Sequence, residues 1–542
     1  MKAIRFTIIG LALGIALGAM NHTALAQKEV KLIGVEEGVF NDHLSAAIIG
    51  DSVIIGSREA ATGTIYANDR GDWERIVDLR ANDHNAENPP YPSFGWAVSI
   101  GAPHDRAAAN AAIIGAPTHG REGGVLVGQG NGAAYIFRRS GRNWKQEIKL
   151  VHPDAADDDQ FGSAVSLYRN TAVVGVSKDD DSGKNSGSAF VYVRDIERKT
   201  WDMQAKLVPQ DLGGSDAFGE VAEIYDRTVV VGAPKHTHNK LRFAGAAYVF
   251  VREGDTWVEQ AKLLPDDAAK AANFGASVSL TGDTIIVGAP LHDTERGKDA
   301  GAAYVFVREG NRWRQQAKLI AADTEKGDRF GHAVATTGKS AIVGAPFRHE
   351  GEQGSGAIYS FVNVNGVWQE KAKAKPEKPE PKINYGSWVV MNGDLVVVSS
   401  HNKRRDGAGN AHGTAAYVYN SVRDLGTLPF AVDPSGLNVT TLGRVKRTAL
   451  LQNFPNPFNP ETWLPYRLGA DAPVTLRIYN VRGQLTRELD LGAQKAGSYL
   501  TRETAAHWDG RDEVGETVSS GVYFYSLQAG SFQDTRRMLV VK

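Results

Sequence analysis

The stretch FGASVSLTGDTIIVGAP at residues 274–290 decides the fold, because the chain repeats it. Close copies stand on either side, FGEVAEIYDRTVVVGAP at residues 218–234 and FGHAVATTGKSAIVGAP at residues 330–346. Phe-Gly or Tyr-Gly pairs begin at positions 94, 161, 218, 274, 330 and 385, and a degenerate pair, Phe40 with Asn41, opens the series. From position 161 onward the interval is 55–57 residues, and a fixed period of this kind indicates one structural unit that is stacked many times.

Each copy contains four strand-like runs rather than helices. In the copy that begins at Phe274 they are residues 276–280, 284–288, 302–307 and 312–320, and the first three are rich in β-branched or aromatic residues. The third run, AAYVFV, is apolar on both faces, so both sides of the sheet need covering. Four-stranded units stacked around an axis meet that need. The sequence therefore predicts an all-β protein, with a seven-bladed β-propeller followed by a small C-terminal immunoglobulin-like β-sandwich.

The two ends of the repeat region predict how the ring closes. The seventh copy lacks its fourth strand, while QKEVKLI at residues 27–33 resembles QEIKLV at residues 146–151 of the second copy. We therefore expect the N-terminal strand to pair beside residues 415–419 and to complete the last blade. The predicted propeller spans residues 27–425.

The N-terminus predicts export. Lys2 and Arg5 precede a short apolar run at residues 6–20, and Ala24-Leu25-Ala26 forms an A-x-A cleavage site, so residues 1–26 are typical of a signal peptide. We expect an extracellular or outer cell-surface protein without a transmembrane segment. The sequence has 0 Cys, which excludes thiol catalysis and Cys-based zinc sites, and its net charge of −1 gives no reason to expect a nucleic-acid partner.

The connections are unequal, and this predicts where a ligand binds. Tight turns join strands one to two and three to four, whereas long polar loops join strands two to three and four to one. Alternating connections emerge at opposite ends of a propeller, and binding residues concentrate on loops held by a rigid scaffold. We expect ligand contacts from the long loops, with these candidates: His119, Arg121, His236, His238, His292, Arg296, Arg348, His349, Arg404 and Arg405.

No cofactor, metal site or catalytic residue is predicted. The acidic runs at residues 157–159 and 179–181 are explained by solvated loops or by calcium binding, and the sequence leaves both open. Asp159, Asp216 and Asp328 recur two residues before a Phe-Gly pair, and this recurrence predicts a structural role in capping loop N–H groups.

The words FG, VGAP and GAAYVF resemble the FG-GAP family, the propeller repeat of integrin α-subunit heads and of many exported bacterial proteins, over residues 28–420. The resemblance implies a seven-bladed propeller used in adhesion or ligand recognition. Integrin-type repeats carry a D-x-D-x-D-G calcium loop between strands one and two. The matching turn here, LTGDT at residues 280–284, has a single carboxylate, so calcium is not carried over.

The C-terminal part follows a polar linker at residues 426–447. Residues 448–542 contain strand-like runs at 474–480, 485–491, 520–530 and 535–542. NPFNP at 456–460, HWDGRD at 507–512, GVYFY at 521–525 and RRMLVVK at 536–542 resemble type IX secretion sorting domains and the FlgD-like Ig domain. This resemblance implies contact with secretion machinery and attachment to the cell surface, or else a plain accessory module.

Together these features predict a non-enzymatic binding or adhesion protein that recognises an extracellular protein or glycan. Two alternatives remain open. One is an extracellular hydrolase or lyase acting on polysaccharides, which paired carboxylates in the axial opening would favour. The other is a structural spacer in a surface layer.

Overall fold

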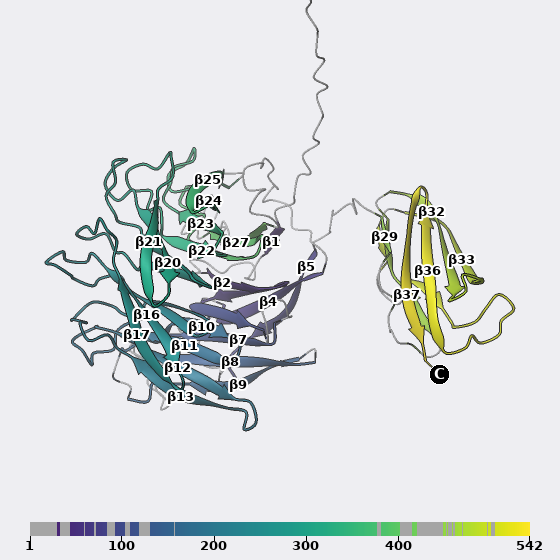
Figure 1. Cartoon of the computed structure of the whole chain (residues 1–542), viewed down its shortest axis with the longest axis horizontal. Coiled ribbons are helices and arrows are strands. Elements are labelled where there is room, and N and C mark those ends of the chain that lie inside the picture. The colour runs from purple at the N-terminus through teal and green to yellow at the C-terminus, as the bar shows by residue number, and fades with distance from the viewer. Residues whose placement is uncertain are drawn as a thin grey trace, which may run out of the picture. The chain divides into compact units, whose positions relative to one another are not determined.

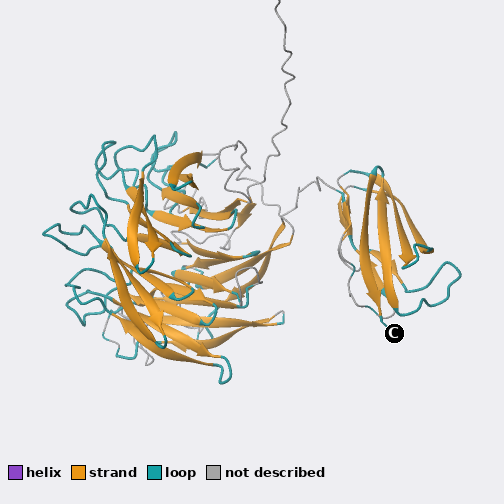
Figure 2. Cartoon of the chain, viewed as in Figure 1, coloured by secondary structure: helices purple, strands orange, loops and turns teal. Residues whose placement is uncertain are grey.

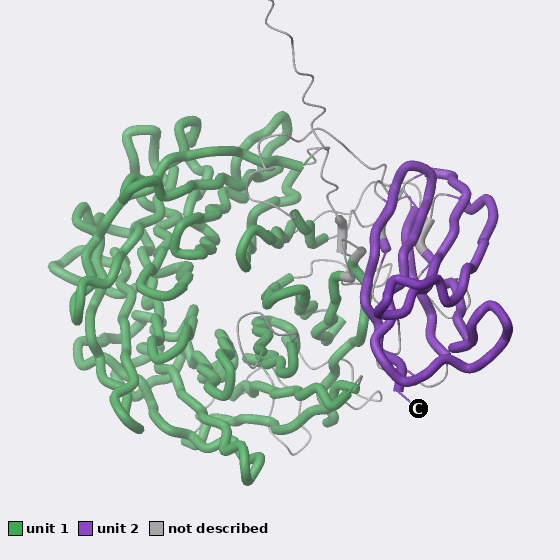
Figure 3. Tube along the Cα trace, turned by 45° about the vertical axis from the view of Figure 1, so that its right-hand side comes forward, with its two compact units in different colours: residues 1–431 green, residues 432–542 purple. Residues whose placement is uncertain are grey.

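The computed structural model describes residues 30–32, 44–58, 60–69, 72–83, 93–102, 109–118, 131–141, 143–154, 156, 158–376, 381–400, 415–419, 448–450, 453, 458, 461–468, 470–495, 497–499 and 505–541. The chain divides into two compact units, Met1–Ala431 and Val432–Lys542 (Figure 3). The signal peptide predicted at residues 1–26 and the linker predicted at residues 426–447 lie outside the described residues. Every described element is a strand, and no helix occurs among them (Figure 2).

The described part of unit 1 forms seven four-stranded antiparallel sheets (Figure 1). The first three contain β2 (Leu44–Ile49), β3 (Ser52–Ser57), β4 (Thr62–Asp69) and β5 (Asp72–Leu79); β6 (Ala97–Gly101), β7 (Ala111–Ala116), β8 (Ala133–Ser140) and β9 (Asn143–Leu150); and β10 (Phe161–Tyr168), β11 (Thr171–Val176), β12 (Ser188–Asp195) and β13 (Thr200–Leu207).

The next three sheets follow at the repeat interval. They contain β14 (Val221–Tyr225), β15 (Thr228–Ala233), β16 (Ala246–Glu253) and β17 (Thr256–Leu263); β18 (Ser277–Thr281), β19 (Thr284–Ala289), β20 (Ala302–Glu309) and β21 (Arg312–Leu319); and β22 (Ala333–Thr336), β23 (Ser340–Ala345), β24 (Ala357–Val364) and β25 (Val367–Ala374). The predicted strands of the copy at Phe274 therefore agree with β18–β21 to within one or two residues at each end.

The last sheet combines both ends of the repeat region. Its order is β1 (Val30–Leu32), β28 (Ala415–Tyr419), β27 (Leu395–Ser400) and β26 (Trp388–Asn392). Lys31 pairs with Tyr417, as Lys149 of β9 pairs with Tyr135 of β8, so β1 takes the register of a fourth strand. The first strands contact one another in chain order, and β26 contacts β2, so the sheets surround a common centre (Figure 3). Such repeated sheets fit a β-propeller.

The Phe-Gly and Gly-Ala-Pro words mark where neighbouring sheets touch. A Cβ on Gly288 of β19 would lie 2.0 Å from the carbonyl oxygen of Gly331, and a Cβ on Gly232 of β15 would lie 2.1 Å from that of Gly275. Only hydrogen fits in these gaps. The two motifs therefore recur because neighbouring sheets approach each other closely at these glycines.

Apolar side chains fill the space between successive sheets. One cluster joins Val249 of β16 to Phe274, Ile285 and Tyr304 of the next copy, and all four side chains are buried. All five leading residues of β16 are buried, which confirms that the sheet is covered on both faces. Burial of this kind supplies the main stabilising term in a chain that has 0 Cys.

Unit 2 is a small β-sandwich. It contains β29 (Ala449–Leu450), β30 (Thr462–Leu464), β31 (Tyr466–Leu468), β32 (Ala472–Asn480), β33 (Leu485–Gln494), β34 (Gly497–Tyr499), β35 (Ala506–Trp508), β36 (Gly521–Ala529) and β37 (Phe532–Val540). The sheet β33-β32-β36-β37 packs through Tyr525 and Leu527 on a core that includes Phe458 and Trp508. Within the described residues there is no helix that is long and apolar enough to cross a membrane.

Candidate functional site

The long connections of unit 1 emerge at one end of the sheets, which we call the loop end. In the four consecutive sheets from β10–β13 to β22–β25, the loop between strands two and three is bonded through its backbone to the loop that leads into the next sheet. Ala271 N–H donates to the Arg242 carbonyl at 2.9 Å, and Asn273 N–H donates to the Phe243 carbonyl at 3.2 Å. Gly327 and Arg329 bond in the same way to Lys298 and Asp299. We call these bonded loops, among the described residues, the rim.

A recurring polar cluster anchors the base of the loops. In the sheet β14–β17, Tyr248 Oη donates to Asp211 at 2.9 Å, and Lys262 Nζ donates to Asp211 at 2.5 Å. Lys262 also donates to His236 Nε2 at 2.8 Å, so that nitrogen is an acceptor. His236 Nδ1 therefore carries the proton and donates to Asp216 at 2.6 Å. The cluster joins both long loops to strands β16 and β17.

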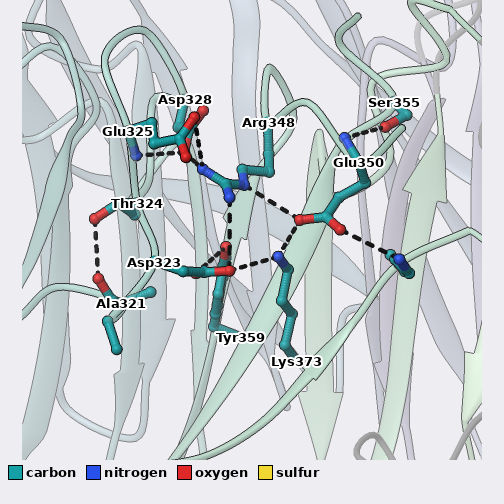
Figure 4. A network of polar contacts seen from close by, with 12 residues as sticks. Ala321, Asp323, Thr324, Glu325, Asp328, Arg348, Glu350, Ser355, Tyr359 and Lys373 are labelled. Atoms are coloured by element: carbon teal, nitrogen blue, oxygen red, sulfur yellow. Dashed lines mark hydrogen bonds and ion pairs between the residues drawn. The ribbon is translucent and has the colours of Figure 1, made fainter. Parts of the chain in front are cut away.

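The next two sheets repeat this cluster. In the sheet β18–β21 the corresponding residues are Asp267, Tyr304, Lys318 and His292, with His292 Nε2 lying 3.0 Å from Lys318 Nζ. In the sheet β22–β25 an arginine replaces the histidine, and the residues are Asp323, Tyr359, Lys373 and Arg348 (Figure 4).

Arg348 holds the largest of these networks (Figure 4). Its guanidinium lies 2.9 Å from Asp328, 3.2 Å from Glu350 and 3.7 Å from Asp323. Burial is the largest single effect on the pKa of Arg348 and lowers it, but the hydrogen bonds to Asp328 and Glu350 and the charge of Asp328 together outweigh burial and raise that pKa. Burial raises the pKa of the Asp328 carboxyl. The network is a charged, buried anchor whose partners depend on one another.

In the other clusters, too, burial and hydrogen bonds shift the pKa values of the anchoring residues. Burial is the largest single effect on the pKa of Asp211 and raises it, but the hydrogen bonds from Lys262 and Tyr248 and the charge of Lys262 together outweigh burial and leave that pKa below its usual value. Burial, followed by the charge of Asp211, raises the pKa of Tyr248. The carboxylates therefore stay ionised and the tyrosines stay protonated as donors, which suits anchoring rather than proton transfer.

The predicted capping by aspartates is confirmed. Asp159 accepts the Ala156 N–H at 2.6 Å, Asp216 accepts the Gly213 N–H at 2.7 Å and Asp328 accepts the Glu325 N–H at 2.7 Å. Each carboxylate reaches back three residues, so the geometry differs from an Asx turn, in which the side chain reaches forward.

The acidic loop at residues 179–181 is occupied by internal contacts. Asp179 accepts from Ser188 at 2.6 Å, lies 2.7 Å from Lys206 and lies 3.3 Å from His152. Asp180 accepts the Asn185 N–H at 2.6 Å. Throughout the described residues, no group of three or more His, Asp or Glu side chains is placed to hold a metal ion.

The structure separates the predicted ligand residues into two groups. His236, His292 and Arg348 are only 3, 3 and 8% exposed and belong to the anchors, so they do not project toward a ligand. His238 is partly buried and its ring stacks on His236, with ring centroids 6.4 Å apart. Arg296 and His349 are exposed on the loops. His119, Arg121, Arg404 and Arg405 lie outside the described residues.

The sequence analysis missed the anchoring partners of these residues. Asp211, Tyr248 and Lys262 have equivalents one repeat later in Asp267, Tyr304 and Lys318. That recurrence was visible in the sequence and could have identified the cluster. A repeated histidine at the loop base then indicates a scaffold role rather than a ligand contact.

Comparison with known proteins supports these repeats. Residues 144–192, 201–250, 257–306 and 313–361 match the FG-GAP repeat. Residues 464–532 match the FlgD Ig-like domain. These matches agree with repeated four-stranded sheets in unit 1 and an Ig-like fold in unit 2.

Integrin α-subunits are among the similar proteins. Integrin alpha-PS3 of Drosophila melanogaster is 29% identical over 164 residues, which are 27% of this chain and 14% of that protein. Integrin alpha-6 of Gallus gallus is 26% identical, over 31% of this chain and 16% of that protein. Integrin alpha-6 of Homo sapiens is 32% identical, over 31% of this chain and 15% of that protein. The similar region is thus about one sixth or less of those proteins.

The solved structure of U3-55K overlays with a TM-score of 0.43 at 11% identity, and the overlay covers 72% of this chain and 98% of that one. A likeness at this level adds nothing to the fold described above.

Proposed function

We propose that this protein is an exported binding or adhesion protein of the cell surface, built on a seven-bladed FG-GAP propeller that spans residues 27–425. The ligand is an extracellular protein or glycan, and it binds at the loop end. The C-terminal Ig-like domain at residues 448–542 serves secretion and attachment, with type IX sorting as the specific proposal. The FG-GAP repeats and the similarity to integrin α-subunits support the binding role.

The observation that carries this proposal is the rigid rim at the loop end. Paired backbone hydrogen bonds join neighbouring loops, as between Arg242 and Ala271, and buried ion pairs such as Arg348 with Asp328 fix each loop base. A preformed loop surface loses little conformational entropy when it binds, and that favours affinity. The tight turns at the opposite end offer much less side-chain surface.

The test is a binding screen of the secreted, full-length chain against glycans and matrix proteins, with calcium and with a chelator. We expect binding that survives the chelator and is lost when the loop at residues 235–243 is replaced by Gly-Ser residues. The matched control replaces the tight turn at residues 253–256 in the same way. Binding that depends on that turn, or binding by unit 2 alone, would contradict the proposal.

The polysaccharide-acting enzyme remains the alternative proposal, because one carboxyl stands out on the inner strands. Glu223 of β14 has a pKa that burial raises to about 7, in the range of a general acid. Turnover assays on polysaccharides, with Glu223→Gln as the inactive reference, test it. Cleavage that is lost in this variant would replace the binding proposal.

A further inference from the structure

One junction between loops gathers exposed cations around an exposed aromatic ring. Lys240, Arg242 and Lys270 are exposed, and within the described part of the chain none of them forms an ion pair. The bond from Ala271 N–H to the Arg242 carbonyl brings Lys270 next to this loop. Phe243 is 37% exposed, and the Arg242 guanidinium lies 5.3 Å from its ring centroid.

The backbone of Phe243 is unusual for its residue type. Its φ is 57°, in the left-handed region, which a bulky side chain rarely adopts. The equivalent positions of the other copies hold Asn185 at 53°, Asp299 at 53° and Gly354 at 66°, all residue types that tolerate this region. A strained aromatic at the tip of a surface loop points to a functional use, because folding alone favours Asn or Gly there.

The corresponding junction one repeat later has two equivalent cations but no aromatic ring like that of Phe243. Lys298 and Lys326 occupy the positions of Arg242 and Lys270 one repeat later, and both are exposed. They are close, because a Cβ on Gly297 would lie 2.9 Å from the Lys326 Cβ. Contacts between β14, β18 and β22 place these two junctions on consecutive sheets. The rim therefore offers two cation pairs, one sheet apart.

Most of the acidic side chains of these loops form hydrogen bonds or ion pairs within the protein. Asp267 accepts from Lys318 and Tyr304, Asp293 accepts the Asp299 N–H at 2.8 Å, and Asp328 pairs with Arg348. Cations consequently face the solvent while most of the carboxylates hold the loops. Chain-wide net charge, which is −1, hides this local separation.

We propose that the junctions formed by Lys240, Arg242, Phe243, Lys270, Lys298 and Lys326 bind an acidic polysaccharide of the uronic-acid class. Lysine and arginine pair with the carboxylates, and the Phe243 ring packs on the C–H face of a sugar, whose hydrogens carry the partial positive charge that an aromatic face attracts. The inference rests on the proposed binding function and names its ligand class.

The spacing of charge favours this ligand over nucleic acid. Asp266 and Glu295 are exposed on the same loops and would repel a closely charged polymer. Duplex DNA carries one charge per roughly 1.7 Å of its axis, whereas a polyuronate carries one carboxylate per sugar. Separated carboxylates can meet the two cation pairs without lying over these acids.

The experiment titrates the full-length secreted chain with polygalacturonate, neutral dextran and duplex DNA at two salt concentrations. We expect salt-sensitive binding of polygalacturonate, and a loss of about tenfold or more in the Arg242→Ser/Lys270→Ser variant, since exposed ion pairs each contribute modestly. The matched control, Lys145→Ser/Arg312→Ser, removes two exposed cations of outer strands and should bind as the parent does.

A second variant separates stacking from charge. Phe243→Asn relieves the backbone strain, so it should fold at least as well as the parent and still bind polygalacturonate several-fold more weakly. Equal binding by this variant, or DNA binding as tight as polygalacturonate binding, would overturn the assignment to a sugar ligand. If the chain binds a protein or neutral glycan through the loop end but ignores polygalacturonate, this inference fails while the proposed function stands. If it binds none of these ligands, both fail.

Discussion

Trp257 Nε1 donates a 2.8 Å hydrogen bond to Gln204 Oε1, and this bond ties the outer strand β17 to the outer strand β13 of the preceding sheet. Trp313 bonds to Gln260 at 2.9 Å and Trp368 bonds to Gln316 at 2.8 Å in the same way. Trp201 bonds at 3.0 Å to Glu147, which takes the place of the glutamine. This recurring hydrogen bond from a Trp indole to the outer strand of the preceding sheet, which we call the latch, explains why Trp recurs at the repeat interval.

Removing an acceptor from this latch should destabilise unit 1. In Gln260→Ala the Trp313 indole N–H loses its partner, and we expect a loss of about 1–2 kcal/mol in the free energy of unfolding. Chemical denaturation measures it. Lys371→Ala is the control, because Lys371 stands at the equivalent position of the outer strand β25 and is exposed. An equal loss in both variants would mean that the latch contributes nothing specific.

Gly288 should tolerate no side chain. In Gly288→Ala the new Cβ would meet the Gly331 carbonyl oxygen at 2.0 Å, so the two sheets must separate. We expect a cost of about 3 kcal/mol or more, read as a large drop in Tm or in soluble yield. Gly310→Ala is the control, with a φ of 64° but open space around it, and should cost about 1 kcal/mol. If the Gly310 variant were the less stable of the two, backbone conformation rather than sheet contact would explain the repeated glycine.

Arg348 should be needed to keep its carboxylates buried. Arg348→Ala leaves Asp328 without its cation, although the Asp328 side chain is only 4% exposed. We expect a cost of about 3–5 kcal/mol, partly recovered by adding Asp328→Asn. Arg314→Ala removes an exposed pair with Glu309 at 2.7 Å and should leave the thermal stability almost unchanged. Thermal unfolding of these three variants and of Asp328→Asn alone checks this, and additive losses without recovery would contradict the coupling.

Glu223 should make stability depend on pH. Its carboxyl accepts the Leu280 N–H at 2.8 Å, at a position where neighbouring sheets use Ser166 or Ser279. Burial raises its pKa from 4.5 to about 7, so the folded state binds the proton more tightly than the unfolded chain. The stability from this proton is complete below pH 4.5 and is lost as the pH rises through about 7.

We expect the free energy of unfolding of the parent to fall by about 1–3 kcal/mol more than that of Glu223→Gln between pH 5 and 8. Denaturant titrations at several pH values measure this difference. Glu220→Gln is the control, because Glu220 is exposed and pairs only loosely with Lys235 at 3.5 Å. Parallel pH profiles for the parent and Glu223→Gln would contradict the assignment.

The repeat, the strand positions and the place of the long loops can be predicted from the sequence alone. These follow from local signals: alternating apolar residues set β18–β21, tight-turn residues set the hairpins, and the glycines of Gly-Ala-Pro and Phe-Gly set the contacts between sheets. Because each signal recurs in several copies, a strand or turn that is ambiguous in one copy can be assigned from the others.

Which loop residues face the solvent depends on contacts between segments that are distant in the sequence. The polar loops that contain His236, His292 and Arg348 predict exposed side chains. In the structure these side chains are buried against aspartates of a preceding loop, which stand 20–25 residues earlier in the chain. Likewise, the Phe243 carbonyl accepts the Asn273 N–H of the neighbouring loop, and its backbone is left-handed. Such pairings depend on which loops meet across a sheet boundary, and no local pattern records that.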